Sequence, residues 1–315
     1  MHLIFCERLP FHPAGRDRLL NAGSSRRNRF RLPIAVLRLP IVHCLVTIAF
    51  LSSCMTFRKA DSVMRNQFQQ KGIALNTATI KIQGHNIHYA QTGADTLPTL
   101  VFIHGTPGSW DAFANYMQDP DLLHHYRMIS VDRPGFGYSD FGNVASSLTD
   151  QSKLIDQALS KLSNNKPMLL AGHSLGGPLI VQMAADNPSL FCGLVIISGS
   201  VDPAKEKPEK WRPVIFKTPL NLLVPGAFRP SNEELWYLKK DLVTLKASFA
   251  AIRCPVFFIH GAADTWVPPG NVEYAKKLLV NTERIGELII PGANHFIPWT
   301  KFKEIKEVLL QLPMN

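Results

Sequence analysis

The sequence lacks the features that mark several classes of protein. It has no internal repeat and no low-complexity block, which excludes a solenoid or a collagen-like chain. No group of His, Cys, Asp and Glu has the spacing of metal ligands, and no glycine-rich loop is of the phosphate-binding kind, so we expect no metal and no cofactor. No uninterrupted apolar run reaches the roughly 20 residues that a membrane-spanning helix needs. The 315 residues, 46% of them hydrophobic, are nevertheless enough to bury a substantial single core.

Acidic residues are fewer than basic ones, and the location of the basic excess decides what it means. The chain has 34 Lys and Arg against 24 Asp and Glu, a net charge of +10. Residues 1–53 hold eight basic and two acidic residues, hence +6, and the remainder holds 26 and 22, hence +4. A surplus of four is typical of an ordinary protein surface, so we expect no nucleic-acid partner.

The N-terminal segment has the pattern of a leader. "RRNRFRLP" (26–33) is followed by the apolar stretch "IAVLRLPIVHCLVTIAF" (34–50), an order typical of a secretory signal. "LSSC" at 51–54 resembles the bacterial lipobox, in which the cysteine is diacylated and becomes the first residue of the mature protein. The pattern therefore predicts a signal segment over residues 1–53 and lipidation of Cys54.

An uncleaved signal anchor is the alternative. Because the basic side of a leader stays in the cytoplasm, both alternatives place the rest of the chain outside it. Since two acyl chains anchor a protein stably, we expect a membrane-anchored bacterial lipoprotein that faces the periplasm. Residues 54–75 would then be a tether, and a single domain would occupy residues 76–315.

From residue 76 onward, strand patterns alternate with helix patterns. Residues 78–93 are typical of a hairpin that turns at Gly84-His85-Asn86. Short apolar runs that end in polar or Gly residues follow at 99–105, 127–132, 167–174, 193–198, 255–261 and 287–292. Helical patterns lie between them, which predicts a mainly parallel sheet with helices on both faces. Ligands bind such sheets at the carboxyl ends of the strands.

The stretch "LLAGHSLGGPLI" (169–180) places a serine in a tight turn between an apolar strand and a helix. Such a turn leaves no room for a Cβ atom at Gly172 or Gly176 and holds Ser174 in strained backbone angles. The hydroxyl is then lifted clear of the chain, and the N–H of Leu175 is free at the start of a helix, where negative charge is favoured. In this context G-x-S-x-G indicates a nucleophile elbow.

A serine hydroxyl is a weak nucleophile near neutral pH, so it needs a base and a carboxylate that orients the base. His295 follows the last predicted strand and can lie over the elbow, whereas we expect structural roles for His173 and His260. Asp264 follows the strand before and gives the chain order serine, aspartate, histidine. Asp202, after the neighbouring strand, is the alternative carboxylate.

Two backbone N–H groups should stabilise the oxygen that becomes negatively charged when a carbonyl is attacked. Leu175 supplies one of them. The loop "HGTPGS" (104–109) follows the first long apolar strand, and Gly105 and Gly108 allow it to approach closely. We therefore expect the N–H of Thr106 to be the second donor.

The motifs "HGTPGS", "VDRPGFGYSD", "GHSLGG", "GAADTWVP" and "GANH" occur in an order that resembles the α/β-hydrolase superfamily, over roughly residues 76–312. The resemblance implies the α/β-hydrolase fold, with a mainly parallel eight-stranded sheet, helices on both faces and a small helical cap inserted at 201–250. The first two motifs resemble the branch that holds epoxide hydrolases, haloalkane dehalogenases, proline iminopeptidases and small-molecule esterases.

Two positions depart from parts of that branch. Epoxide hydrolases and dehalogenases use aspartate at the elbow, where this chain has Ser174, and proline iminopeptidases carry "HGGPG", where this chain has Thr106. We therefore expect a serine hydrolase that cleaves an ester or other acyl bond of a small or lipid-like substrate through an acyl-enzyme. A peptidase that binds a substrate amine through Glu233 or Glu234 is one alternative, and a non-catalytic binding protein is another.

Two further features leave alternatives open. Cys192 and Cys254 precede strands that should be neighbours, so they form either a disulfide or two buried thiols. In the cap, apolar side chains either line an acyl pocket or pack the cap onto the core. These are Trp211, Phe216, Leu222, Leu223, Val224, Phe228, Leu235 and Trp236.

Overall fold

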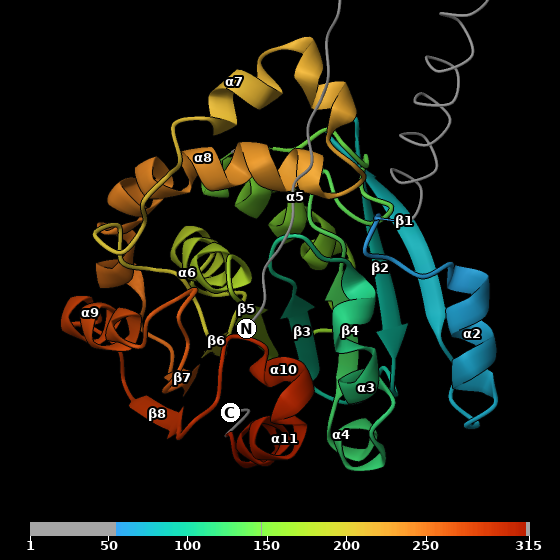
Figure 1. The fold of residues 1–315 in the computed structure, drawn as a ribbon. Coiled ribbons are helices and arrows are strands. Elements are labelled where there is room, and N and C mark those ends of the chain that lie inside the picture. The colour runs from blue at the N-terminus through green and yellow to red at the C-terminus, as the bar shows by residue number, and fades with distance from the viewer. Residues whose placement is uncertain (1–54, 146, 313–315) are drawn as a thin grey trace, which may run out of the picture. The chain divides into compact units, whose positions relative to one another are not determined.

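The computed structural model describes residues 55–145 and 147–312, and eight strands of this part form one sheet (Figure 1). They are β1 (Asn76–Ile82), β2 (His85–Thr92), β3 (Thr99–Ile103), β4 (Arg127–Val131), β5 (Met168–His173), β6 (Gly193–Ile197), β7 (Val256–Gly261) and β8 (Ile285–Ile290). The order across the sheet is β1-β2-β4-β3-β5-β6-β7-β8. β1 and β4 each run antiparallel to β2, whereas all neighbours from β4 to β8 in that order are parallel. The predicted mainly parallel eight-stranded sheet is confirmed.

Helices cover both faces of the sheet, which is why every residue of β3, β4, β5 and β6 is buried. One core packs α5 (Leu148–Lys161), α6 (Gly176–Asp186), α8 (Phe228–Leu245) and α9 (Gly270–Leu278) against the sheet. The other core packs α2 (Asp61–Gln69), α3 (Ala114–Met117), α4 (Pro120–His125) and α11 (Phe302–Gln311). The shorter elements are η1 (Trp110–Phe113), α7 (Arg212–Phe216), η2 (Pro219–Leu223), η3 (Ser248–Ala251) and α10 (Ile297–Thr300).

The first hairpin turns earlier than the sequence predicts. β1 ends at Ile82 and β2 begins at His85, so the turn consists of Gln83 and Gly84 rather than residues 84–86. Both have positive φ, +50° and +89°. A two-residue turn of this kind matches the right-handed twist of the strands, and this favours it over the longer turn.

Residues 61–75 are part of the packed domain, so the prediction of a tether over 54–75 is wrong for them. Met64 and Phe68 lie one helical turn apart on α2, and both are buried in the core that contains Trp110. Asp61, at the start of α2, accepts a hydrogen bond from Trp110 Nε1 at 3.3 Å. The predicted leader (1–53) and Cys54 lie outside the described residues, and none of the described helices is long and apolar enough to cross a bilayer.

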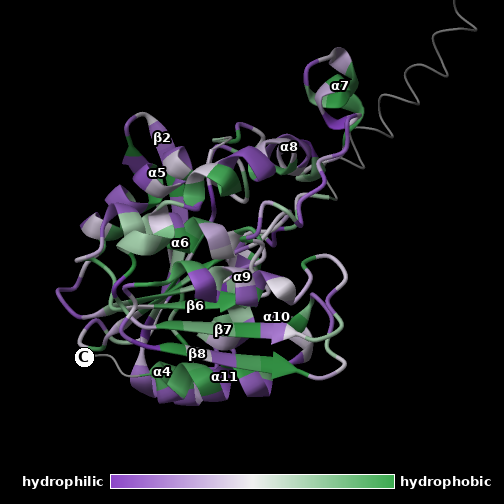
Figure 2. Ribbon diagram, turned by 90° about the vertical axis from the view of Figure 1, so that its left-hand side faces the viewer, coloured by the Kyte–Doolittle hydropathy of each residue, from purple (hydrophilic) through white to green (hydrophobic). Residues whose placement is uncertain are grey.

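The segment between β6 and β7, which includes the predicted cap at 201–250, contains α7, η2, α8 and η3. The second half of α8 belongs to the core, where Leu238, Leu242 and Leu245 are buried. Figure 2 shows α7 on the side toward which β8 points, so this segment lies at the carboxyl ends of the strands. Several of its apolar side chains are exposed, namely Trp211, Leu222, Leu223 and Phe228.

Cys192 and Cys254 do not form a disulfide with each other, so the second alternative, two thiols, holds. Both are partly buried thiols, and burial raises the pKa of each to about 11. They are therefore protonated and weakly nucleophilic at neutral pH.

Phe68→Ala should lower the free energy of unfolding by about 3–5 kcal/mol, because it leaves a cavity in the core beneath α2. Val63→Ala is the matched control, because Val63 lies on the exposed side of the same helix and its loss should cost less than about 0.5 kcal/mol. Urea unfolding of the two variants measures the difference. Equal, small effects would show that α2 is not part of the cooperative unit.

Candidate active site

Ser174 lies in a tight turn between β5 and α6, with φ of +54°. The glycines on either side are required by space. A Cβ atom at Gly172 would lie 2.3 Å from the carbonyl oxygen of Gly176, and one at Gly176 would lie 2.3 Å from the carbonyl oxygen of Ile103. The close approach of three backbone segments therefore fixes the serine in a strained conformation at the end of β5.

His295 lies within hydrogen-bond distance of Ser174 on one side of its ring and of Asp264 on the other. Ser174 Oγ is 3.0 Å from His295 Nε2, and His295 Nδ1 is 2.7 Å from Asp264 Oδ2. Because an ionised carboxylate only accepts, Nδ1 carries the proton and Nε2 is left as the acceptor for the serine hydroxyl. Asp264 and His295 are buried and Ser174 is half-buried. The loops after β7 and β8 bring the aspartate and the histidine to the serine.

Asp264 is held in its ionised form by three hydrogen bonds. Its Oδ1 accepts from the backbone N–H groups of Trp266 and Val267, at 3.0 and 2.8 Å, while Oδ2 accepts from His295. Burial raises the pKa of this carboxyl, but these hydrogen bonds outweigh it and leave the pKa below its ordinary value. Asp264 is thus a charged, oriented acceptor for the imidazole.

His173 supports the loop that carries His295. Its Nε2–H donates to the carbonyl oxygen of His295 at 3.0 Å, and its ring packs edge-on against Trp299. Burial, and next the proximity of His295, lower the pKa of His173 to about 3. It therefore stays neutral at physiological pH and acts as a structural donor.

The remaining candidates lie away from the serine or are otherwise bonded. Asp202 Oδ1 accepts from the N–H of Ala204 at 2.8 Å, so this aspartate closes a turn and does not contact His295. His260 Nε2 donates to the carbonyl oxygen of Val267 at 2.8 Å, behind Asp264. The structure therefore brings Asp264, and not Asp202, to the histidine.

The two predicted oxyanion donors border the serine. Among the described residues, no hydrogen bond uses the N–H of Leu175 or of Thr106. Leu175 is the N-cap of α6, where negative charge is favoured. A Cβ atom at Gly105 would lie 2.8 Å from Ser174 Cβ, so the loop of Thr106 packs directly on the elbow. Both residues therefore adjoin the serine, and neither N–H group is used within the described part of the chain.

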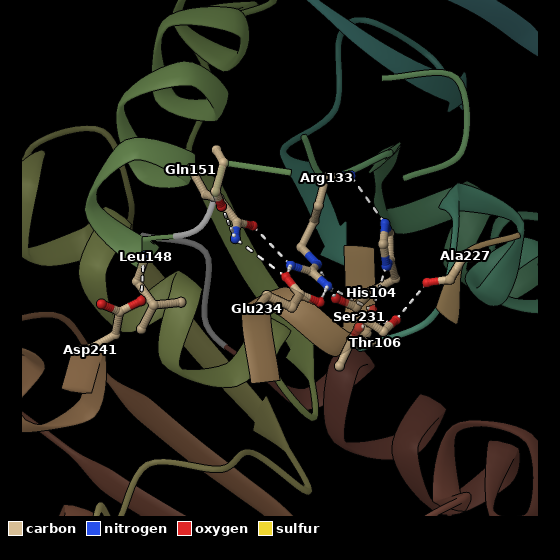
Figure 3. A network of polar contacts seen from close by, with 11 residues as sticks. His104, Thr106, Arg133, Leu148, Gln151, Ala227, Ser231, Glu234 and Asp241 are labelled. Atoms are coloured by element: carbon tan, nitrogen blue, oxygen red, sulfur yellow. Dashed lines mark hydrogen bonds and ion pairs between the residues drawn. The ribbon is translucent and has the colours of Figure 1, made fainter. Parts of the chain in front are cut away.

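The loop of Thr106 is held by contacts that the sequence analysis did not predict (Figure 3). Arg133, just after β4, is fully buried and pairs with Glu234 of α8 through two hydrogen bonds of 2.8 and 2.9 Å. Its only sequence signal was its place in "VDRPGFGYSD", directly after a strand. Glu234 is thus engaged inside the protein, whereas the peptidase alternative needed it for a substrate amine.

Exposed aromatic side chains surround His295. The rings of Trp266 and Phe296 lie 5.6 and 6.0 Å from its imidazole, and Phe296 also contacts Trp299. All three are at least two-fifths exposed. A separate apolar cavity of about 160 Å³ lies at the opposite, amino ends of β7 and β8, next to Pro255 and Arg284, and so is remote from the serine.

Comparisons with known proteins support the fold and the family. The family model described as alpha/beta hydrolase fold matches residues 98–224. The 2-hydroxy-6-oxononadienedioate/2-hydroxy-6-oxononatrienedioate hydrolase of Burkholderia vietnamiensis is 31% identical over 263 residues, which cover 71% of this chain and 90% of the relative.

The pimeloyl-[acyl-carrier protein] methyl ester esterase of Shewanella oneidensis is 35% identical over 127 residues, 40% of this chain. In five curated relatives, this esterase included, the matched segment spans only 28 to 44% of the relative's length. Among solved structures, a membrane phospholipase A described as a bacterial virulence factor superposes with a TM-score of 0.59 at 18% identity, covering 89% of this chain and 97% of the other.

Gly176→Ala should lower the free energy of unfolding by about 1–3 kcal/mol, because the added methyl group meets the backbone of β3 and cannot be accommodated without a shift. Gly270→Ala is the matched control, since a Cβ atom there meets only the side chain of Lys205 at an ordinary 3.6 Å. Denaturant unfolding of both variants tests this. If Gly176→Ala were as stable as Gly270→Ala, the close approach at the elbow would be refuted.

Proposed function

Because this chain belongs to the α/β-hydrolase fold family, we propose that it is a serine hydrolase that cleaves an ester or other acyl bond through an acyl-enzyme. The continuous hydrogen-bonded series from Ser174 through His295 to Asp264 is the observation that carries this proposal. It joins a nucleophile, a base and an orienting carboxylate at the carboxyl ends of parallel strands.

In the first half of the reaction, His295 Nε2 removes the proton from Ser174 Oγ as the oxygen attacks the acyl carbon. The carbonyl oxygen becomes negatively charged and accepts hydrogen bonds from the N–H groups of Leu175 and Thr106. The bond to the leaving group then breaks, and the leaving group takes the proton from His295. The serine is left as an acyl ester.

The second half repeats these steps with water. His295 removes a proton from a water molecule, whose oxygen attacks the acyl carbon of the ester at Ser174. The same two N–H groups stabilise the second oxyanion, and the proton on His295 returns to Ser174 Oγ as the acid product leaves. Asp264 stays ionised throughout and stabilises the imidazolium that forms twice per cycle.

A small or lipid-like acyl substrate fits the surroundings of the site best. The exposed rings of Trp266, Phe296 and Trp299 offer apolar contact beside His295, and exposed apolar residues of the cap lie at the same end of the sheet. The name of the Shewanella relative, an ester hydrolase, adds support for an ester over an amide. The peptidase alternative is weaker, because Glu234 is paired with Arg133 and burial raises the pKa of Glu233.

Attachment to a membrane outside the cytoplasm, through the predicted leader or a lipidated Cys54, remains part of this proposal. The described chain begins beside the cap, where the carbonyl oxygen of Met55 accepts from the N–H of Ala227 at 2.8 Å. Phe57 packs edge-on against Phe228, and both are exposed. An anchor that ends at residue 54 would hold the cap, with its apolar surface, close to the bilayer.

Treatment of the full-length protein with a fluorophosphonate probe should label Ser174, because only an activated serine reacts rapidly. Ser174→Ala and His295→Ala should abolish labelling at this position, and mass spectrometry of the labelled peptide measures it. His125→Ala, a change at an exposed histidine of α4, should label at the wild-type rate. A folded wild-type protein that is not labelled would favour a binding protein of the same fold.

Asp264→Asn should reduce kcat about 10⁴-fold on whichever ester, thioester or aminoacyl-amide is turned over, because the amide favours the wrong tautomer of His295. Asp202→Asn tests the alternative carboxylate and should keep kcat within a few-fold of the wild type, since Asp202 closes a turn. Steady-state kinetics decides between them. A large loss in Asp202→Asn with none in Asp264→Asn would reverse the assignment.

A further inference from the structure

Arg133 uses all its side-chain donors inside the protein. Nε donates to the carbonyl oxygen of His104 at 2.9 Å and Nη2 to that of Gly105 at 3.0 Å. Nη1 donates to Gln151 Oε1 at 2.8 Å, and the two terminal nitrogens bind the carboxylate of Glu234. A guanidinium offers five N–H groups in a fixed plane, so these contacts define the positions of its partners closely.

The two carbonyl groups that Arg133 binds belong to the residues directly before Thr106. Gly105 packs against Ser174, as the 2.8 Å approach of an added Cβ atom shows. Any shift of His104 and Gly105 therefore moves the Thr106 N–H relative to the serine. Arg133 therefore holds the backbone directly before Thr106.

Two residues on one face of α8 connect the cap to the same loop, one directly and one through Arg133 (Figure 3). Glu234 binds Arg133, and Ser231, three residues earlier, accepts a hydrogen bond from Thr106 Oγ1 at 2.7 Å. Ser231 Oγ in turn donates to the carbonyl oxygen of Ala227 at 2.8 Å. One helix thus holds both the arginine that fixes the loop and the side chain of the proposed oxyanion donor.

His104 adds a contact within the loop. Its Nε2 accepts from the N–H of Arg133 at 3.0 Å, so the proton is on Nδ1, which donates to the carbonyl oxygen of Gly105 at 2.7 Å. Burial, and next the charge of Arg133, lower the pKa of His104 well below its ordinary value. The neutral ring therefore keeps this arrangement across the physiological pH range.

We propose that Arg133 and Glu234 are positioning residues, through which cap helix α8 fixes the Gly105–Thr106 loop in the geometry that binds the oxyanion at Ser174. This inference rests on the proposed function. A buried ion pair is by itself a weak source of stability, because the cost of removing two charges from water offsets their attraction. What the pair supplies here is the fixed direction of two carbonyl groups beside the nucleophile.

The primary test is Glu234→Gln in the full-length protein, with Asp241→Asn as the matched control. Asp241 is another carboxylate of α8. It accepts a hydrogen bond from the backbone N–H of Leu148 at 3.1 Å and does not contact the loop. Glu234→Gln should reduce kcat about 100-fold, the effect of a displacement near 1 Å, and change KM less than threefold. Asp241→Asn should leave both near the wild-type values.

A second readout does not depend on activity. The N–H of Arg133 is bonded to His104 Nε2, so its hydrogen exchange reports on the loop contact. Exchange in peptides that contain residue 133 should be faster in Glu234→Gln than in Asp241→Asn. Unchanged exchange in a folded Glu234→Gln protein would overturn the proposal, whether or not the wild type is an active hydrolase.

The double variant Arg133→Met/Glu234→Leu guards against simple unfolding, because it removes both buried charges together. With folded sites counted by fluorophosphonate titration, kcat per site should still fall about 100-fold. A folded double variant with wild-type kcat would overturn the positioning role and leave the pair purely structural. If the wild type itself is not labelled, the proposed function fails, the catalytic part of this inference fails with it, and the exchange data decide only whether α8 holds the loop.

Discussion

The close approach of backbone segments around Ser174 is the constraint on which the rest of the site depends. Gly172, Gly176 and Gly105 each lie where a Cβ atom would come within 2.8 Å of another part of the elbow or of the end of β3. Because the segments touch directly, the serine cannot relax to an ordinary turn, and it keeps a φ of +54°. The strain is sustained by the fully buried strands on either side of β5.

Parallel strands then determine which loops reach the serine. β3, β5, β7 and β8 all end at the same edge, and their loops carry Thr106, Ser174, Asp264 and His295 respectively. Neighbouring groups limit the freedom of each loop. His173, which adjoins the serine, donates to the backbone of His295, so the two loops are tied together next to the hydrogen bonds that link the three side chains.

The polar interior of the site shows a division of roles. Asp264 keeps its charge because three donors surround it, and that charge faces the imidazole. The charges of Arg133 and Glu234 neutralise each other, and the guanidinium also binds two carbonyl groups of the loop that adjoins the serine. Both arrangements satisfy buried charges with hydrogen bonds, which is the condition under which charge can be buried at all. The cap is therefore connected to the rest of the domain in two ways. Polar contacts link it to the loop beside the elbow, and the second half of α8 packs its apolar side chains into the core.

Local pattern by itself determined the sheet, its helices on both faces and the elbow, because strand periodicity and glycine spacing act over short stretches of chain. It also indicated His295 and Asp264 as candidates, because both follow predicted parallel strands, whose carboxyl ends lie at the same edge of the sheet. Tertiary structure alone decided between Asp264 and Asp202, since both follow strands and only the distance to the imidazole separates them. It likewise packed Phe68 into the core where a tether was predicted, and paired Glu234 with Arg133, 101 residues away. These outcomes depend on contacts between segments that are far apart in the chain, and the local pattern of residues does not determine the energies of such contacts.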